Sequence, residues 1–234
     1  MGTLVIVPGL MCDEAVWAPQ AAALAGHDCR VATHGLLDSL TLMARKALDE
    51  APPGRLSVAG HSMGGRVALE MQRLAPERVE RMALLDTGFA ALPAGEAGER
   101  EKAFRFGLLA TAKSRGMRAM AADWARGMVH PRRLDTPLFE SVLDMLERSS
   151  VMQFEAQIAA LLARRDASAQ LPGIGCPTLV LCGAQDGWAN VAQHEALQRG
   201  IAGSELVVVP DCGHMSTMEQ PEAVSAALLR WLAR

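Results

Sequence analysis

The sequence contains no tyrosine and no long apolar run. Without tyrosine, no phenol group can serve as a catalytic acid or as a donor to an oxyanion. A helix that crosses a membrane needs about 20 consecutive apolar residues, and no stretch approaches that length, so we expect no membrane segment. The apolar start at residues 1–8 is short, lacks a basic leader and is typical of a strand rather than a signal peptide.

The sequence also has few cysteines and a small net charge. The five cysteines are an odd number without disulfide-framework or metal-ligand spacing, which favours a reduced, cytoplasmic setting and no metal site. The formal net charge of -3 gives no reason to expect nucleic acid or another polyanion as a partner. The chain has 234 residues, half of them apolar, and it can therefore form one sizeable domain with a large core.

The most informative stretch is Gly60-His-Ser-Met-Gly-Gly65, which joins an apolar run at 56–59 to a helical pattern at 63–75. A serine on so sharp a strand-to-helix turn exposes its hydroxyl, and the small flanking residues let the two backbones approach closely. The start of the helix adds free N–H donors and a positive dipole end. An ordinary glycine-rich turn is the alternative, but this context favours a nucleophile at Ser62.

Strand and helix signals alternate along the chain. Apolar, strand-favouring runs predict strands at 3–7, 30–34, 55–61, 79–85, 177–182 and 205–209. Helical patterns follow most of them, and residues 89–173 carry helix-forming composition with no strand signal. The alternation predicts an α/β fold, with a mostly parallel sheet of about six strands flanked by helices and several helices inserted between two strands.

Two more polar residues follow predicted strands at the same edge of the sheet. A serine hydroxyl needs a base, usually histidine, and that histidine is oriented by a carboxylate. His214 follows the strand at 205–209 and Asp186 follows the strand at 177–182, so Ser62, Asp186 and His214 come in the order expected for this topology. Asp86 also ends a strand and is a rival for the acid. His61, next to the nucleophile, fits a structural role at the sheet edge.

With these residues in place, the whole sequence resembles the α/β-hydrolase superfamily, as a serine esterase-like member with a helical cap. The segments that carry the resemblance are Gly60–Gly65, Gly183-Ala-Gln-Asp186 and Cys212-Gly-His214. The resemblance implies that Ser62 is the nucleophile, Asp186 the acid and His214 the base. Asp86 is then expected to cap its loop together with Thr87.

The resemblance also implies an oxyanion hole formed by the backbone N–H groups of Leu10 and Met63. This chain has Pro8-Gly9-Leu10 where family members commonly carry His-Gly, a change that removes neither donor. The family's two N-terminal antiparallel strands have no room before Thr3, so we expect a fold that lacks them. That edge of the sheet would be exposed and open to a partner, which leaves a homodimer open.

The insertion corresponds to the helical cap of the family, which covers the site. It divides the chain into an α/β-hydrolase core at 1–88 and 174–234 and a cap at 89–173. Large apolar side chains near the site are candidates for lining a substrate pocket, although packing in the core is the ordinary role of such residues. These candidates are Trp124, Met128, Met145 and Trp188.

Nine lysines and arginines lie between residues 100 and 133, against two acids, Glu101 and Asp123. We favour a solvated helical face, balanced by nearby acidic residues. The functional alternative is a basic lid that attracts a substrate bearing a carboxylate.

The expected activity is hydrolysis of a carboxylic ester with a small-to-medium acyl group, through an acyl-enzyme intermediate and without any cofactor. The same residues would serve a carbon–carbon bond hydrolase acting on a ring-cleavage diketone, or transfer of the acyl group to an acceptor other than water. A catalytically idle, ligand-binding member of the fold is the remaining alternative.

Overall fold

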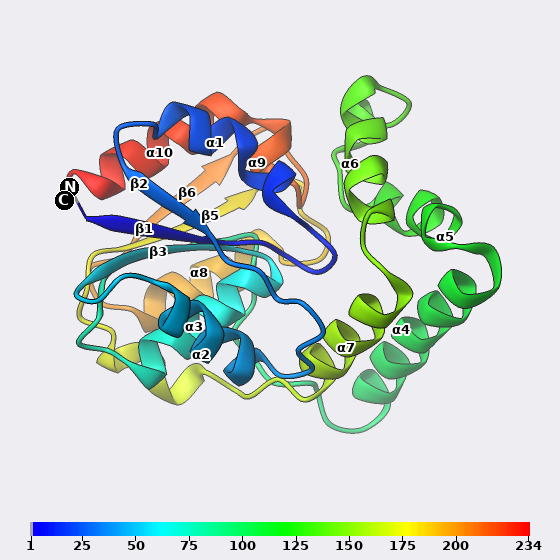
Figure 1. Ribbon diagram of the computed structural model, residues 1–234, viewed down its shortest axis with the longest axis horizontal. Coiled ribbons are helices and arrows are strands. Elements are labelled where there is room, and N and C mark those ends of the chain that lie inside the picture. The colour runs from blue at the N-terminus through cyan, green and yellow to red at the C-terminus, as the bar shows by residue number, and fades with distance from the viewer. Residues whose placement is uncertain (1) are drawn as a thin grey trace.

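A single parallel sheet with helices on both faces forms the centre of the computed structural model, which describes residues 2–234 (Figure 1). The strand order is β2-β1-β3-β4-β5-β6, and all neighbours pair in parallel. The strands are β1 (Thr3–Val7), β2 (Asp28–Val31), β3 (Leu56–His61), β4 (Val79–Leu85), β5 (Thr178–Gly183) and β6 (Glu205–Val209). The predicted α/β class and parallel sheet are confirmed.

The helices cover the two faces of this sheet. Figure 1 shows α1, α9 and α10 on one face and α2, α3 and α8 on the other. Their bounds, with the 3₁₀ helices included, are η1 (Glu14–Trp17), α1 (Ala18–Ala23), α2 (Leu40–Glu50), α3 (Met63–Leu74), η4 (Ser168–Gly173), α8 (Val191–Gly200), α9 (Ser216–Glu219) and α10 (Pro221–Leu232). Because both faces are covered, every residue of β3 and β5 is buried, as their continuous apolar sequences predict.

Between β4 and β5 the chain leaves the sheet and forms a group of helices beyond one edge (Figure 1). They are α4 (Glu96–Arg115), α5 (Met117–Trp124), η2 (Ala125–Gly127), η3 (Pro131–Arg133), α6 (Pro137–Glu147) and α7 (Val151–Leu162). A capping box starts α7, in which Ser150 Oγ accepts the N–H of Gln153 while Gln153 Oε1 accepts the N–H of Ser150. The helical insertion is confirmed, and its status as a separate cap domain at 89–173 stays a prediction.

Register brings the carboxyl ends of the central strands to one edge. Val7 pairs with Gly60, His61 with Leu85, and Gly183 with Val209. The residues that follow β3, β4, β5 and β6 therefore emerge next to one another, on the side of the sheet that faces the inserted helices.

The second strand differs from its predicted range of 30–34, because it begins at Asp28 and ends at Val31. Ala32 N still donates to Ile6 O, but the neighbouring strand β1 ends at Val7, and the next residue, Pro8, has no N–H. The next residues make other bonds instead, since His34 Nε2 lies 3.0 Å from Pro8 O and Thr33 O accepts from Lys46. Competing side-chain contacts thus shorten β2.

β2 is also an outermost strand of the sheet, with only one neighbouring strand, and three of its four residues are exposed. Pairing of this edge with a second copy of the chain stays a prediction. The five cysteines are all free thiols, and the compartment stays a prediction as well. In residues 2–234, no helix combines the length and the apolar character that crossing a membrane requires.

Candidate active site

Ser62 lies between β3 and α3 with φ 55° and ψ −118°, a backbone conformation that is strained for a residue with a side chain. Two glycines make the turn possible. A Cβ atom on Gly60 would collide with the carbonyl of Gly64, and one on Gly64 would collide with the carbonyl of Val7. Strand β1, strand β3 and helix α3 therefore approach one another as only glycine allows.

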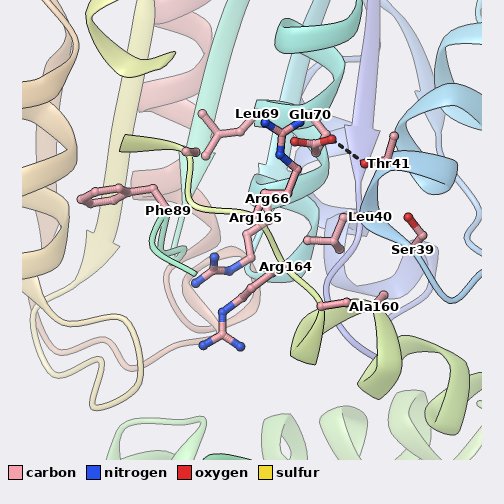
Figure 2. A pocket seen from close by; sticks show the side chains of 12 residues that line it. Ser39, Leu40, Thr41, Arg66, Leu69, Glu70, Phe89, Ala160, Arg164 and Arg165 are labelled. Atoms are coloured by element: carbon pink, nitrogen blue, oxygen red, sulfur yellow. Dashed lines mark hydrogen bonds between the residues drawn. The ribbon is translucent and has the colours of Figure 1, made fainter. Parts of the chain in front are cut away.

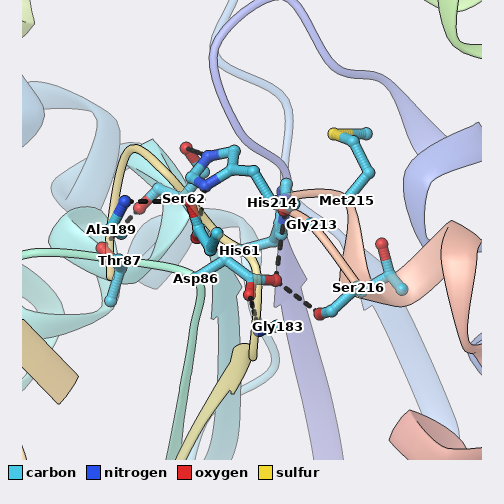
Figure 3. A network of polar contacts seen from close by, with 12 residues as sticks. His61, Ser62, Asp86, Thr87, Gly183, Ala189, Gly213, His214, Met215 and Ser216 are labelled. Carbon is cyan, nitrogen blue, oxygen red and sulfur yellow. Dashed lines mark hydrogen bonds and ion pairs between the residues drawn. The ribbon is translucent and has the colours of Figure 1, made fainter. Parts of the chain in front are cut away.

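Backbone and side-chain bonds hold this turn in place. Ser62 N donates to Leu85 O at 2.9 Å, which ties the turn to the end of β4. Thr87 Oγ1 donates to Ser62 O at 2.6 Å, and Gly65 N donates to the same oxygen at 3.0 Å. The strained conformation is thus over-determined by its surroundings, and the hydroxyl of Ser62 is directed toward His214 (Figure 3).

Three residues from separate loops form a continuous chain of hydrogen bonds. Ser62 Oγ lies 2.8 Å from His214 Nε2, and His214 Nδ1 lies 2.7 Å from Asp186 Oδ2. The other carboxylate oxygen, Asp186 Oδ1, accepts the N–H groups of Trp188 and Ala189 at 2.8 and 2.9 Å. The carboxylate is therefore fixed on both sides, and it holds the imidazole with its proton on Nδ1 and its Nε2 lone pair toward the serine.

Burial and charge set the protonation of this pair. Burial alone would lower the pKa of His214, but the charge and hydrogen bond of Asp186 outweigh it, so the pKa is raised above the ordinary value of 6.5. Burial likewise acts to raise the pKa of Asp186, and His214 together with the two backbone donors lowers it below its ordinary value. The geometry therefore favours an ionised carboxylate that stabilises a protonated imidazole.

Asp86 lies beneath the histidine and forms a separate network (Figure 3). Its Oδ1 accepts the N–H of Gly183 at 3.1 Å, and its Oδ2 accepts the hydroxyl of Ser216. The expectation that Asp86 caps its own loop together with Thr87 is wrong, because the Asp86 carboxylate bonds Gly183 and Ser216, which belong to other segments. Full burial and the negative charge of Asp186 raise the pKa of Asp86 well above its ordinary value.

His61 links this network to the histidine loop. The ring is fully buried, and its Nε2–H donates to the backbone carbonyl of His214 at 2.8 Å. Burial and then the neighbouring His214 charge lower the pKa of His61 to about 3, so the ring is neutral. Its position fits the structural role that the sequence suggests, since it supports the backbone of His214 and makes no contact with Ser62 Oγ among the described hydrogen bonds.

Two further residues shape the histidine loop, and neither is predicted from the sequence pattern. The buried carboxylate of Glu219 accepts the N–H groups of His130, Gly213 and Met215, at 2.7, 3.0 and 3.2 Å. Gln185 Oε1 accepts the N–H of Cys212 at 2.9 Å. No sequence motif marks these two side chains. Each acts by accepting bonds from backbone N–H groups that only the folded chain brings close to it.

The inserted helices reach the histidine directly. His214 N donates to Met128 O at 2.7 Å, a bond between the histidine loop and the turn after η2. Trp188 lies between this region and the site, with ring centroids 5.0 Å from both Trp124 and His214. The position of the histidine therefore depends on the insertion as well as on the sheet.

The amides expected to form an oxyanion hole flank the serine. Met63 N is at the first position of α3, and Leu10 lies in the loop after β1; both residues line the same cavity as Ser62. Neither amide donates to a protein acceptor among the hydrogen bonds of the described residues. Two free donors from residues that line the cavity of the serine suit an oxyanion hole, which stays a prediction.

The cavity has a volume of about 430 Å³ and is open at one side. Trp124, Met128 and Trp188 line it together with Ser62 and His214, and their contact with a substrate stays a prediction. Met145 does not line it, so that expectation is wrong. Met145 belongs to α6, and its side chain is fully buried. It lines a different cavity, between α6, α7 and the loop after β1. Helical periodicity shows that Met145 is buried but cannot tell which surface buries it.

Most of the basic residues between 100 and 133 lie on the outer surface of the insertion. Arg118, for example, bonds Glu140, Asp144 and Glu147, and it is exposed. The solvated helical face therefore describes most of the stretch. Arg105 differs from these exposed residues, because it lines the cavity together with Arg66 and Arg164.

A serine, a histidine and an aspartate in this arrangement, on this sheet, match a known group of proteins. The model of the alpha/beta hydrolase family matches residues 4–227. The chain belongs to this family. Among residues 2–234, no group of three or more His, Cys, Asp or Glu side chains is arranged to hold a metal ion.

Similar proteins include hydrolases of several kinds. The pimeloyl-[acyl-carrier protein] methyl ester esterase of Nitrosomonas europaea is 26% identical over 237 residues, covering 94% of this chain and 91% of that protein. The 2-hydroxy-6-oxononadienedioate/2-hydroxy-6-oxononatrienedioate hydrolase of Escherichia coli (strain K12) is 24% identical over 208 residues, covering 81% of this chain and 66% of that protein.

Among solved structures, a thermophilic esterase from Thermogutta terrifontis with malate bound superposes with a TM-score of 0.88. It is 25% identical, and the match covers 100% of this chain and 90% of that chain. The family and its fold follow from these similarities, and hydrolysis is the general chemistry that they share.

Proposed function

We propose that this hydrolase cleaves a carboxylic ester with a small-to-medium acyl group through an acyl-enzyme intermediate. The observation that carries the proposal is the hydrogen-bonded chain from Ser62 Oγ through His214 to Asp186, which opens into a cavity of about 430 Å³. Cavities of this size suit small organic ligands. The similarity to two proteins that are named esterases supports the same conclusion.

In the first half of the proposed reaction, His214 Nε2 takes the proton of Ser62 as its Oγ attacks the ester carbonyl. Asp186 stabilises the imidazolium that forms. The N–H groups of Leu10 and Met63 bind the oxyanion of the tetrahedral intermediate, and losing one such donor typically costs about 10²–10³ in rate. His214 then protonates the alkoxide oxygen as it leaves, and the acyl group remains on Ser62.

In the second half, a water molecule takes the place of the alcohol. His214 removes its proton, the hydroxyl attacks the acyl carbonyl, and the carboxylic acid leaves as His214 returns the proton to Ser62 Oγ. Every proton transfer uses the same imidazole, and the proposed reaction needs no cofactor.

The proposal is tested with a panel of chromogenic esters of graded acyl length, assayed with the wild type and with Ser62→Ala. We expect turnover of short and medium acyl chains by the wild type, and a loss of about 10⁴-fold or more in the variant. Circular dichroism of both proteins controls for folding. Equal turnover by the two proteins would place the chemistry elsewhere.

A carbon–carbon bond hydrolase acting on a ring-cleavage diketone is the second candidate. The specific observation in its favour is the similarity to the Escherichia coli hydrolase of an oxononadienedioate. The same serine, histidine and aspartate would act on a ketone carbonyl, and a carbanion would leave in place of an alkoxide. Turnover of a vinylogous diketone, with no turnover of any ester in the panel, would favour this candidate over the esterase.

A further inference from the structure

The cavity that contains Ser62 has a second polar region formed by three arginines and one glutamate. Arg66 lies on α3, four residues after Ser62, so the two residues are one helical turn and a rise of about 6 Å apart. Arg105 and Glu101 lie on α4, and Arg164 follows α7. We call Arg66, Arg105 and Arg164 the arginine cluster. It joins the helix that carries the serine to two segments of the insertion.

Glu101 neutralises only part of this charge. Its carboxylate accepts two bonds from Arg164, at 2.8 and 2.7 Å, and one from Arg105 Nε at 2.9 Å. Three guanidinium groups thus face one carboxylate in this part of the cavity. Asp166 is the other acid close to Arg66, but it is exposed and its oxygens accept the N–H groups of Ala91 and Ser168. An excess of positive charge remains.

Several donors of the cluster have no acceptor. Arg66 donates one bond, from Nη1 to the backbone carbonyl of Ala90 at 2.8 Å, and its remaining N–H groups are unbonded among the described residues. The Arg164 side chain is 7% exposed, and its buried Nε has no partner. A buried charged donor without an acceptor costs free energy, as Arg164 Nε does, whereas Arg66 is partly exposed in the cavity and its unbonded N–H groups are open to an anion. Figure 2 shows Arg66 and Arg164 beside a smaller cavity of about 40 Å³, which they also line.

A purely structural role accounts for part of the cluster but not for all of it. The bonds of Glu101 to Arg105 and Arg164 tie α4 to the end of α7, as an internal ion pair would. Arg66 has no carboxylate partner, and burial followed by the charge of Arg164 lowers its pKa to about 10. An arginine next to like charge, lining the same cavity as the candidate nucleophile and with free donors, is arranged for an anion from outside the protein.

We propose that the arginine cluster is a subsite for a free carboxylate of the substrate, so that the enzyme acts on esters carrying a second, ionised carboxyl group. This inference rests on the proposed ester hydrolysis at Ser62. A carboxylate suits the site because Glu101 already balances part of the positive charge. The remaining excess of positive charge matches a small anion of low charge. A guanidinium group binds a carboxylate with two parallel bonds.

The test compares substrates that differ in one group. Monomethyl glutarate is paired with methyl 5-oxohexanoate, in which a methyl group replaces one carboxylate oxygen, and methanol release gives kcat/KM for each. A second pair carries the same two groups on the alcohol side of an acetate ester. We expect the carboxylated member of at least one pair to be preferred by about tenfold or more, as a charge-assisted hydrogen bond predicts. Equal or better turnover of the neutral members would overturn the subsite.

Variants locate the preference. Arg66→Met should lower the ratio of kcat/KM for the carboxylated over the neutral ester by about tenfold, and Arg66→Lys should restore part of that ratio because it keeps the charge. Arg118→Met is the matched control, since Arg118 is an exposed arginine of the insertion outside the cavity, and it should leave the ratio unchanged. An unchanged ratio in Arg66→Met would contradict the proposal. If that variant does not fold, the substrate pairs on the wild type still decide the question.

A binding measurement separates the subsite from the chemistry. Titration of glutarate into Ser62→Ala and into Ser62→Ala/Arg66→Met, followed by calorimetry, reports on the cluster without turnover. Binding to the first and at least tenfold weaker binding to the second would support the subsite even if no ester were hydrolysed. Hydrolysis of neutral esters without any glutarate binding or carboxylate preference would leave the proposed function standing and overturn the subsite.

Discussion

The edge of the sheet and the inserted helices line the same cavity, but they hold their residues by different means. At the sheet edge, backbone bonds and strand register fix Ser62, Asp186 and His214. In the insertion, side-chain packing and ion pairs such as Arg164–Glu101 set the positions. Backbone-determined geometry is rigid and readable from sequence, whereas packed helices can change their lining residues without losing the fold. The candidate chemistry therefore belongs to the sheet edge and the candidate specificity largely to the insertion.

The sharpest test of the sheet edge compares its two buried aspartates. Asp186→Asn should lower kcat by about 10⁴-fold, because the amide can no longer hold and stabilise the imidazole of His214. Asp86→Asn should lower kcat by less than about tenfold, since Asp86 makes no bond to that ring and its full burial, which raises its pKa, suits an uncharged amide. Steady-state kinetics of both variants on one ester gives the comparison. The reverse ranking would make Asp86 the acid.

Two glycine substitutions compare the crowded turn at the sheet edge with an open position on a helix of the insertion. Gly64→Ala should lower the free energy of unfolding by about 3 kcal/mol or more, because the new Cβ meets the carbonyl oxygens of Val7 and Pro8. Gly107→Ala, in the middle of α4, should raise it by about 0.5–1 kcal/mol, since no atom lies within 4 Å and alanine favours helix. Urea unfolding measures both. Similar effects at the two sites would show that the insertion is as constrained as the sheet edge.

The pH profile tests the charge arrangement at the sheet edge. His214 must be neutral to accept the proton of Ser62, and Asp186 raises its pKa above 6.5 despite burial. We therefore expect kcat/KM to rise with pH through a midpoint above 6.5. In Asp186→Asn the residual activity should rise through a lower midpoint, because burial then acts without the opposing carboxylate. A midpoint below 6.5 in the wild type would contradict this arrangement.

The smallest expected effect concerns the contact between the two regions. Trp188 packs against both Trp124 and His214, so Trp188→Leu should raise KM by about two- to tenfold through the loss of stacking. Met152→Leu, at an exposed position of α7, is the matched control and should leave KM unchanged. An unchanged KM in Trp188→Leu would show that this contact does not shape the substrate site.

The sequence was sufficient to predict the strands and the residues that follow them. Runs of apolar and strand-favouring residues predicted the location of all six strands. The glycines around Ser62 identified the turn, because only glycine fits where the backbones approach so closely. The short second strand was displaced by two or three residues. Its end depends on bonds made by Pro8, His34 and Lys46, which lie outside the strand itself.

Residues that act through tertiary contacts escaped prediction. Met145 was expected in the pocket, but helical periodicity does not distinguish one buried face from another. Asp86 follows a strand as Asp186 does, and only the fold shows that it bonds Gly183 and Ser216. The arginine cluster combines Arg66 with residues from two separate segments of the insertion, so counting charges in one stretch could not reveal it.

The central claim is that Ser62 is a nucleophile activated by His214. The most direct measurement is labelling of the intact protein with a serine-reactive fluorophosphonate, followed by peptide mass spectrometry. We expect one phosphonylated peptide with the modification on Ser62, and no labelling in His214→Ala, because the 2.8 Å contact between Ser62 Oγ and His214 Nε2 supplies the base. An unlabelled Ser62, or equal labelling in the His214 variant, would contradict it.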